Sequence, residues 1–188
     1  MFAALSMALE PLRIPIFFWP GQYFHFWEVP VIIAFFLFGF KVGFSVAILD
    51  AIGYITLFPD GAGIIGPPWR IVVILTMFTG LLLAKKIVSH YFIINDKNLQ
   101  KEKRWTKPVL FFTVFAIISR VVIMPFVDFA VYKFLLPFVI GHSIPDIYIM
   151  SLMPAIIFFN IVVPLYTIPI AYLTSKTIHT NMKIGNAL

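Results

Sequence analysis

The sequence contains no cysteine and little charge. Without cysteine the chain cannot form disulfide bonds, a thiol nucleophile or a metal site built from thiolates. Charged residues make up 12% of the 188 residues, whereas soluble globular domains carry about 25%. So few charges could not cover a water-facing surface around an apolar interior, and this composition argues against a soluble enzyme or binding module.

Apolar residues are abundant instead: 61% of the chain is hydrophobic, and Phe alone occurs 22 times. Crossing a bilayer takes about 20 apolar residues in a helix. We therefore predict an all-α integral membrane protein in which residues 1–188 form a single compact bundle of six transmembrane helices. The predicted helices are 2–19, 29–39, 43–58, 69–90, 108–138 and 147–175.

The first predicted helix, 2–19, could also be read as a signal peptide. It lacks a basic start, however, and Glu10 and Arg13 lie in its middle. We therefore interpret it as a membrane helix. Glu10 and Arg13 are three residues apart, so on a helix they would share a face and could pair.

Basic residues are concentrated in the predicted connections on one side of the bundle. With the N-terminus inside, 10 of the 14 Lys and Arg residues fall on the cytoplasmic side. They are Lys41, Lys85, Lys86, Lys97, Lys101, Lys103, Arg104, Lys107, Lys176 and Lys183. The positive-inside rule then predicts a multi-pass protein of the cell membrane with both termini in the cytoplasm. Because these charges flank apolar runs, they indicate a lipid bilayer rather than nucleic acid as the partner.

Several polar side chains fall inside the predicted spans. A charge at bilayer depth costs about 2.5–3.5 kcal/mol on insertion scales, so each one is a functional candidate. Arg120 lies 12 residues into its helix, ~18 Å deep at 1.5 Å per residue. Arg120, Asp50 and Asp128 could form structural ion pairs or contact a solute, and both interpretations stay open. Asp128 and Asn160 are predicted nearer the outer side, where a solute could reach them.

Aromatic residues gather in the first outer loop and at the start of the fourth predicted helix. The loop contains Tyr23, Phe26 and Trp27, and the helix begins with Trp69-Arg70. One interpretation is an interfacial belt, since Trp and Tyr favour the headgroup region. The other is a wall or lid that stacks on a flat solute. The loop by itself favours the belt slightly.

The sequence contains no recognisable catalytic or metal-binding motif. The four histidines are scattered, and none has a second ligand at HxxxH or HExxH spacing. The glycine-rich segment 61–66 is not followed by Lys-Ser/Thr, so it is not a Walker motif. We therefore predict that the protein is not an enzyme, holds no metal, and has no cofactor other than a transported ligand.

A set of short motifs resembles a known membrane family. Ala4 and Ala8 are four residues apart, a spacing that lets another helix approach closely in lipid. With the aromatic loop, the glycines around Lys41, Asp50 in the third helix and the Phe158-Phe159-Asn160 segment, this pattern is similar to the S components of energy-coupling factor (ECF) vitamin transporters. The last segment looks like the Pro-Phe-Asn motif of riboflavin-type members. Those members have Pro at position 158 and Lys at position 163, where this chain has Phe158 and Val163.

The resemblance implies the substrate-binding subunit of an ECF-type ABC importer. Such a subunit would capture a vitamin or related heterocyclic cofactor precursor at the outer face, with riboflavin as the first candidate. Ala4 and Ala8 would contact a membrane scaffold subunit that joins two cytoplasmic ATPase subunits. The predicted substrate-contacting residues are Tyr23, Phe26, Trp27, Trp69, Arg70, Arg120, Asp128 and Asn160.

Two other functions compete with this one. The main alternative is a non-transport six-helix membrane scaffold protein of an envelope-assembly complex. In such a protein the buried charges would be structural pairs, and no small ligand would bind. An intramembrane enzyme ranks last, because the sequence offers no reactive constellation.

Overall fold

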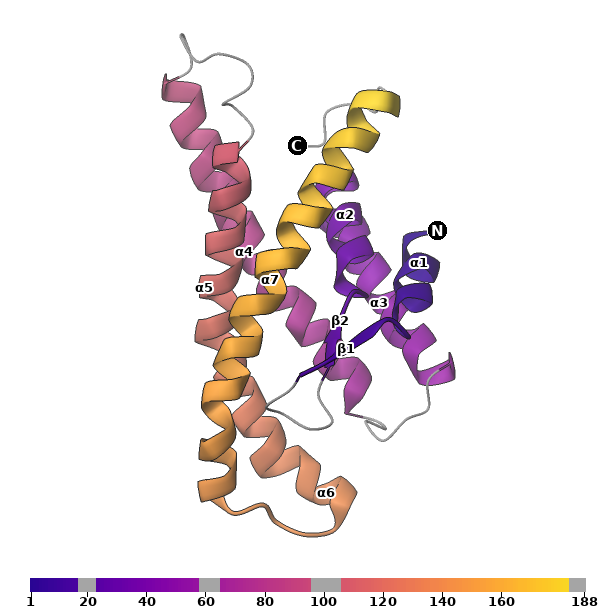
Figure 1. Cartoon of the computed structure of the whole chain (residues 1–188), viewed down its shortest axis with the longest axis vertical. Coiled ribbons are helices and arrows are strands. Elements are labelled where there is room, and N and C mark those ends of the chain that lie inside the picture. Colours follow the sequence, from indigo (N-terminus) through magenta and orange to yellow (C-terminus); the bar gives the residue numbers. More distant parts are fainter. Residues whose placement is uncertain (17–22, 58–64, 96–105, 183–188) are drawn as a thin grey trace.

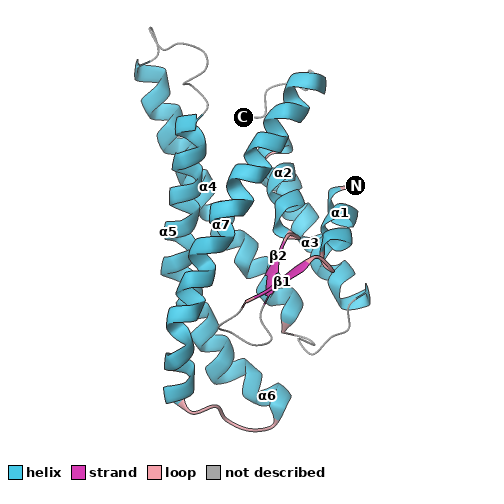
Figure 2. Cartoon of the chain, viewed as in Figure 1, coloured by secondary structure: helices cyan, strands magenta, loops and turns pink. Residues whose placement is uncertain are grey.

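The structure, a computed structural model, describes residues 1–16, 23–57, 65–95 and 106–182, most of which are helical (Figure 2). The helices are α1 (Phe2–Leu9), α2 (Glu28–Phe38), α3 (Phe40–Leu57), α4 (Gly66–Asn95), α5 (Thr106–Ala130), α6 (Leu136–Ile140) and α7 (Asp146–Met182). A π-helical turn, η1 (Val131–Leu135), joins α5 to α6, and two short strands, β1 (Arg13–Pro15) and β2 (Tyr23–His25), pair with each other. The predicted all-α membrane fold is confirmed in outline, with a small hairpin added to it.

Four stretches of the described chain are long and apolar enough to cross a membrane. They are Phe40–Leu57, Gly66–Val88, Pro108–Ile140 and Asp146–Asn181. The last three lengthen the predicted helices 69–90, 108–138 and 147–175 at one or both ends. α2 has 11 residues and α1 has eight, fewer than a bilayer crossing requires. With α5, η1 and α6 taken as one continuous helix, the described residues contain six helical segments, but the prediction of six full spans is not established.

The predicted helix 2–19 is wrong beyond its first two turns. α1 ends at Leu9, and Arg13–Pro15 is extended. Pro11 has no N–H to donate, and its ring clashes with a carbonyl of the preceding turn, so a helix cannot continue through it without a break. Pro15 is likewise at home in an extended edge strand. Residues 17–19 of the predicted helix lie outside the described residues.

α2 is the core of the bundle. Its residues from Val29 to Leu37 are all buried, and it packs against α1, α3 and α7. A helix that is apolar on every side suits this position. Gly39 alone separates α2 from α3, with a φ of 86° that a side chain would disfavour. The predicted helices 29–39 and 43–58 are thus separated by a single residue, and Lys41 lies in the first turn of α3.

The long helices α4, α5 and α7 form the other half of the molecule (Figure 1). The end of α4, the start of α5 and the end of α7 lie at one end of the bundle, whereas α6 and the start of α7 lie at the opposite end. Lys85 and Lys86 lie in the second half of α4 and Lys176 in the second half of α7, toward the predicted cytoplasmic end. The orientation itself stays a prediction.

Gly80 provides a test of the close packing between α4 and α5. A Cβ at this position would lie 2.7 Å from Ala116 Cα and still closer to the Phe115 carbonyl. Because backbone atoms cannot move aside, Gly80→Ala should lower the free energy of unfolding by about 1–3 kcal/mol. Unfolding of the detergent-solubilised protein by heat or denaturant measures this change. Gly53→Ala is the matched control, since its Cβ meets only the flexible end of Met7. Equal destabilisation by both substitutions would contradict the packing.

Candidate functional site

A cavity of about 470 Å³ lies at the end of the bundle away from the lysine-rich helix ends. It is bounded by the hairpin, the first residues of α2 and α4, the end of α3, the α5–η1–α6 helix and the middle of α7. This volume suits a small organic molecule. Its aromatic lining consists of Tyr23, Trp27, Tyr54, Trp69, Tyr132, Phe159 and Tyr166. Its ionisable lining consists of Glu10, Arg13, His25, Glu28, Arg70 and Asp128.

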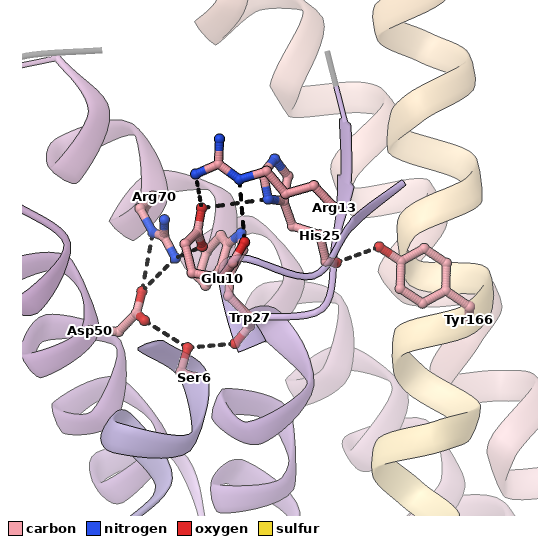
Figure 3. A network of polar contacts seen from close by, with 8 residues as sticks. All are labelled: Ser6, Glu10, Arg13, His25, Trp27, Asp50, Arg70 and Tyr166. Atoms are coloured by element: carbon pink, nitrogen blue, oxygen red, sulfur yellow. Dashed lines mark hydrogen bonds and ion pairs between the residues drawn. The ribbon is translucent and has the colours of Figure 1, made fainter. Parts of the chain in front are cut away.

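Arg70 is the centre of a buried charge network on the α4 side of the cavity (Figure 3). Its Nη2 atom lies 2.9 Å from Glu10 Oε2 and 3.1 Å from Asp50 Oδ2. The guanidinium also faces two aromatic rings, 3.9 Å from the Trp27 centroid and 4.2 Å from the Tyr54 centroid. Ion pairing and cation–π attraction therefore hold one cation between two carboxylates and two rings.

α1 contributes to this network on one face and is exposed on the other. Ser6 Oγ lies 2.6 Å from both Asp50 Oδ1 and the Trp27 carbonyl oxygen. Ala4 and Ala8 lie on the opposite face and are exposed. The structure thus leaves the predicted small-residue stripe accessible.

Polar contacts hold the hairpin at the cavity by one end, where Arg13 lies opposite His25. Glu10 Oε1 lies 3.5 Å from Arg13 Nη2 and 3.5 Å from His25 Nδ1. The Tyr166 hydroxyl on α7 donates a hydrogen bond of 2.7 Å to the His25 carbonyl (Figure 3). The expected pairing of Glu10 with Arg13 is therefore present, although Arg13 lies on a strand.

Arg120 forms a second buried network at the base of the cavity. It is 0% exposed, and its Nη1 donates to Glu28 Oε2 at 2.8 Å while its Nε donates to Asn160 Oδ1 at 3.1 Å. Asn160 Nδ2 in turn donates to the Ile156 carbonyl at 2.9 Å. Arg120 therefore fixes two of the side chains that line the cavity, Glu28 and Asn160, and half of the hydrogen-bonding capacity of Asn160 is used in these two bonds.

Asp128 is the third acidic side chain buried beside the cavity. It is 7% exposed, and its Oδ1 accepts a hydrogen bond of 2.8 Å from Trp69 Nε1. Trp69 and Asp128 come from α4 and α5, so this bond joins the two helices at the cavity wall. Within the described part of the chain, no Lys, Arg or His side chain pairs with Asp128.

The structure brings six of the eight predicted substrate-contacting residues to the cavity wall: Tyr23, Trp27, Trp69, Arg70, Asp128 and Asn160. It does not place the other two there. Phe26 packs on Tyr166, with ring centroids 5.5 Å apart, and Arg120 lies behind Glu28. That the six contact a substrate stays a prediction.

The structural interpretation of the buried charges is right for two of the three residues. Arg120 and Asp50 form ion pairs, but with Glu28 and Arg70 rather than with each other. Asp128 differs, because it forms a hydrogen bond and no ion pair with a described residue.

Sequence reasoning missed several lining residues that have a readable signal. Phe159, Val163 and Tyr166 follow one another at spacings of four and three residues, so they share one face of α7, next to Asn160. Glu28 directly precedes the apolar run of α2. Tyr132 follows Asp128 by four residues and so shares its face, whereas Tyr54 has no comparable signal, because only the packing of α3 brings it to the cavity.

Comparison with known proteins gives one result on the fold. No family model and no curated protein matches this sequence. A solved structure described as "Structure and mechanism of the S component of a bacterial ECF transporter" matches with a TM-score of 0.63, over 97% of this chain and 94% of that chain. The two chains share a fold. Their sequences are 21% identical, so the likeness extends to the architecture and not to the function.

The Arg120–Glu28 pair provides a test of the structural role assigned to the second network. Arg120→Met should lower the free energy of unfolding by about 3–5 kcal/mol, because it leaves a buried carboxylate without its cation. Adding Glu28→Gln should restore part of that loss. Lys133→Met is the control: its partner Asp146 is exposed, so the loss should stay below about 1 kcal/mol. Chemical denaturation in detergent measures all three, and a failure of Glu28→Gln to restore stability would contradict the pairing.

Proposed function

We propose that this protein is the substrate-binding subunit, or S component, of an ECF-type importer, and that it captures a vitamin or related heterocyclic cofactor precursor at the outer face. The cavity carries this proposal. It has the volume of a small organic molecule, and seven aromatic residues line it. Such a lining suits a flat ring system with a few polar groups. The fold shared with an S component supports the same conclusion.

Riboflavin is the first candidate substrate by sequence resemblance. The segment Phe158-Phe159-Asn160 is similar to the motif of riboflavin-type members, and Phe159 and Asn160 both line the cavity. Val163, where those members have Lys, lines it as well. Identification of the compound that the purified protein retains would establish the substrate.

The proposed partners are a membrane scaffold subunit and two cytoplasmic ATPase subunits. Ala4 and Ala8 are exposed on α1, as contact with a second helix in lipid requires. Since the sequence contains no Walker motif, the energy for uphill transport would come from the ATPase subunits.

A pair of variants on α7 tests ligand binding. Val163→Trp should fill part of the cavity and abolish ligand binding, whereas Ile161→Trp, on an exposed face of the same helix, should leave binding unchanged. Visible absorbance and mass spectrometry of material released by denaturation identify a ligand retained on purification, and thermal shifts with a vitamin panel detect weaker binding. A protein that releases nothing and responds to no vitamin would overturn the proposal in favour of a membrane scaffold protein.

A second pair of variants tests partner assembly. Ala4→Trp with Ala8→Trp should block co-purification with the scaffold and ATPase subunits, because the indoles prevent close helix approach. Ligand binding should be unchanged, since neither residue lines the cavity. Leu5→Trp, an equally bulky change at an exposed position between them, is the control. If the subunits still co-purify when both alanines are replaced by tryptophan, this docking face is ruled out.

A further inference from the structure

The cavity wall contains two groups in which carboxylates and aromatic rings come together. In the first, Glu10 and Asp50 supply the carboxylates and Trp27 and Tyr54 supply the rings. The guanidinium of Arg70 lies among all four. This protein therefore already holds one cation at the cavity by ion pairing combined with aromatic faces.

The second group is built from the same side-chain types. Asp128 supplies the carboxylate, while Trp69 and Tyr132 supply the rings, and all three line the cavity. Trp69 donates its indole N–H to Oδ1 at 2.8 Å, which fixes the carboxylate at the wall. Tyr132 follows Asp128 by four residues along a continuous helix, so the two share a face.

The second group differs from the first in having no cation of its own. The nearby cations among the described residues are each placed beside other acids. Arg70 pairs with Glu10 and Asp50, Arg120 with Glu28 and Lys133 with Asp146, and the cavity-lining Arg13 and His25 both lie 3.5 Å from Glu10. Arg120 acts on Asp128 only through its longer-range charge. The undescribed segments that follow β1 and α3, residues 17–22 and 58–64, contain no Lys, Arg or His.

A carboxylate buried beside hydrocarbon is costly until it meets a cation or a proton. Trp69 turns the edge of its indole to this carboxylate through the Nε1–H bond, and the Trp69 and Tyr132 rings line the same cavity, where a bound cation can contact them. A bare metal ion would need several oxygen ligands, and the described residues contain no group of three metal-ligating side chains. An organic cation therefore suits this group better than a bare metal ion does.

We propose that the substrate is a flat heterocyclic compound that carries a positive charge, and that Asp128 binds this charge between Trp69 and Tyr132. The assignment rests on the proposed function and narrows it to one class of substrate. It favours a cationic heterocycle over neutral riboflavin.

A panel of ligands that differ in charge tests the assignment on the full-length protein in detergent. Isothermal titration compares thiamine, a permanent cation, with neutral riboflavin and anionic biotin. A second series keeps one ring and changes only its charge: 1-methylnicotinamide, nicotinamide and nicotinate. The cation of each series should bind at least about tenfold more tightly than its neutral and anionic counterparts, as expected for one charge-assisted contact.

Variants at Asp128 test the residue itself. Asp128→Asn keeps the shape and removes the charge, so the affinity for the best cationic probe should fall about 10- to 100-fold. Asp128→Glu should keep the preference for cations. Asp146→Asn, the same change at an exposed acid outside the cavity lining, should leave affinity unchanged. Elution volume and melting temperature establish that each variant is folded.

The outcomes separate this assignment from the proposed function. Tighter binding of a neutral or anionic vitamin, or full cation affinity in Asp128→Asn, would overturn the assignment and leave an S component with another substrate. A protein that binds nothing in the panel and releases no small molecule on denaturation would overturn the proposed function, and the assignment with it.

Discussion

The arrangement of the elements around the cavity depends on the ion pairs that Arg70 forms with two carboxylates, Glu10 and Asp50. These three residues come from α4, α3 and the end of α1. α1 is too short to be held by a bilayer crossing of its own, and the hairpin that follows it is only two strands wide. The ion pairs give both of them a fixed place against the long helices.

Buried charge networks of this kind fix the positions of side chains more than they raise the net stability of the fold. The desolvation of buried charges offsets much of their mutual attraction, so an apolar replacement could be equally stable. What an apolar replacement could not do is hold polar groups at a cavity wall. Arg120 positions Glu28 and Asn160, and Trp69 positions Asp128, before any solute arrives. A site fixed in advance loses less conformational entropy when a ligand binds.

The sequence predicts this architecture well where one physical rule dominates. The apolar runs and the basic connections between them were enough to predict the long helices, because a helix that crosses a bilayer must be apolar over about 20 residues. The prediction of the first helix is wrong from Pro11 onward. The apolar pattern continues past this residue and favours a helix, but the proline breaks it. The partners of the buried charges were not predictable. Arg120 and Glu28 are 92 residues apart, and nothing local to either indicates the other.

α1 connects the two surfaces that the proposed function needs. Ser6 and Glu10 are four residues apart on the face toward the cavity, and Ala4 and Ala8 are four apart on the exposed face. A helix of eight residues moves as one rigid piece. The same short element therefore contacts the cavity network on one side and presents the small residues on the other. A helix of two turns is long enough to do both, because residues four apart share a face and residues two apart lie on opposite faces.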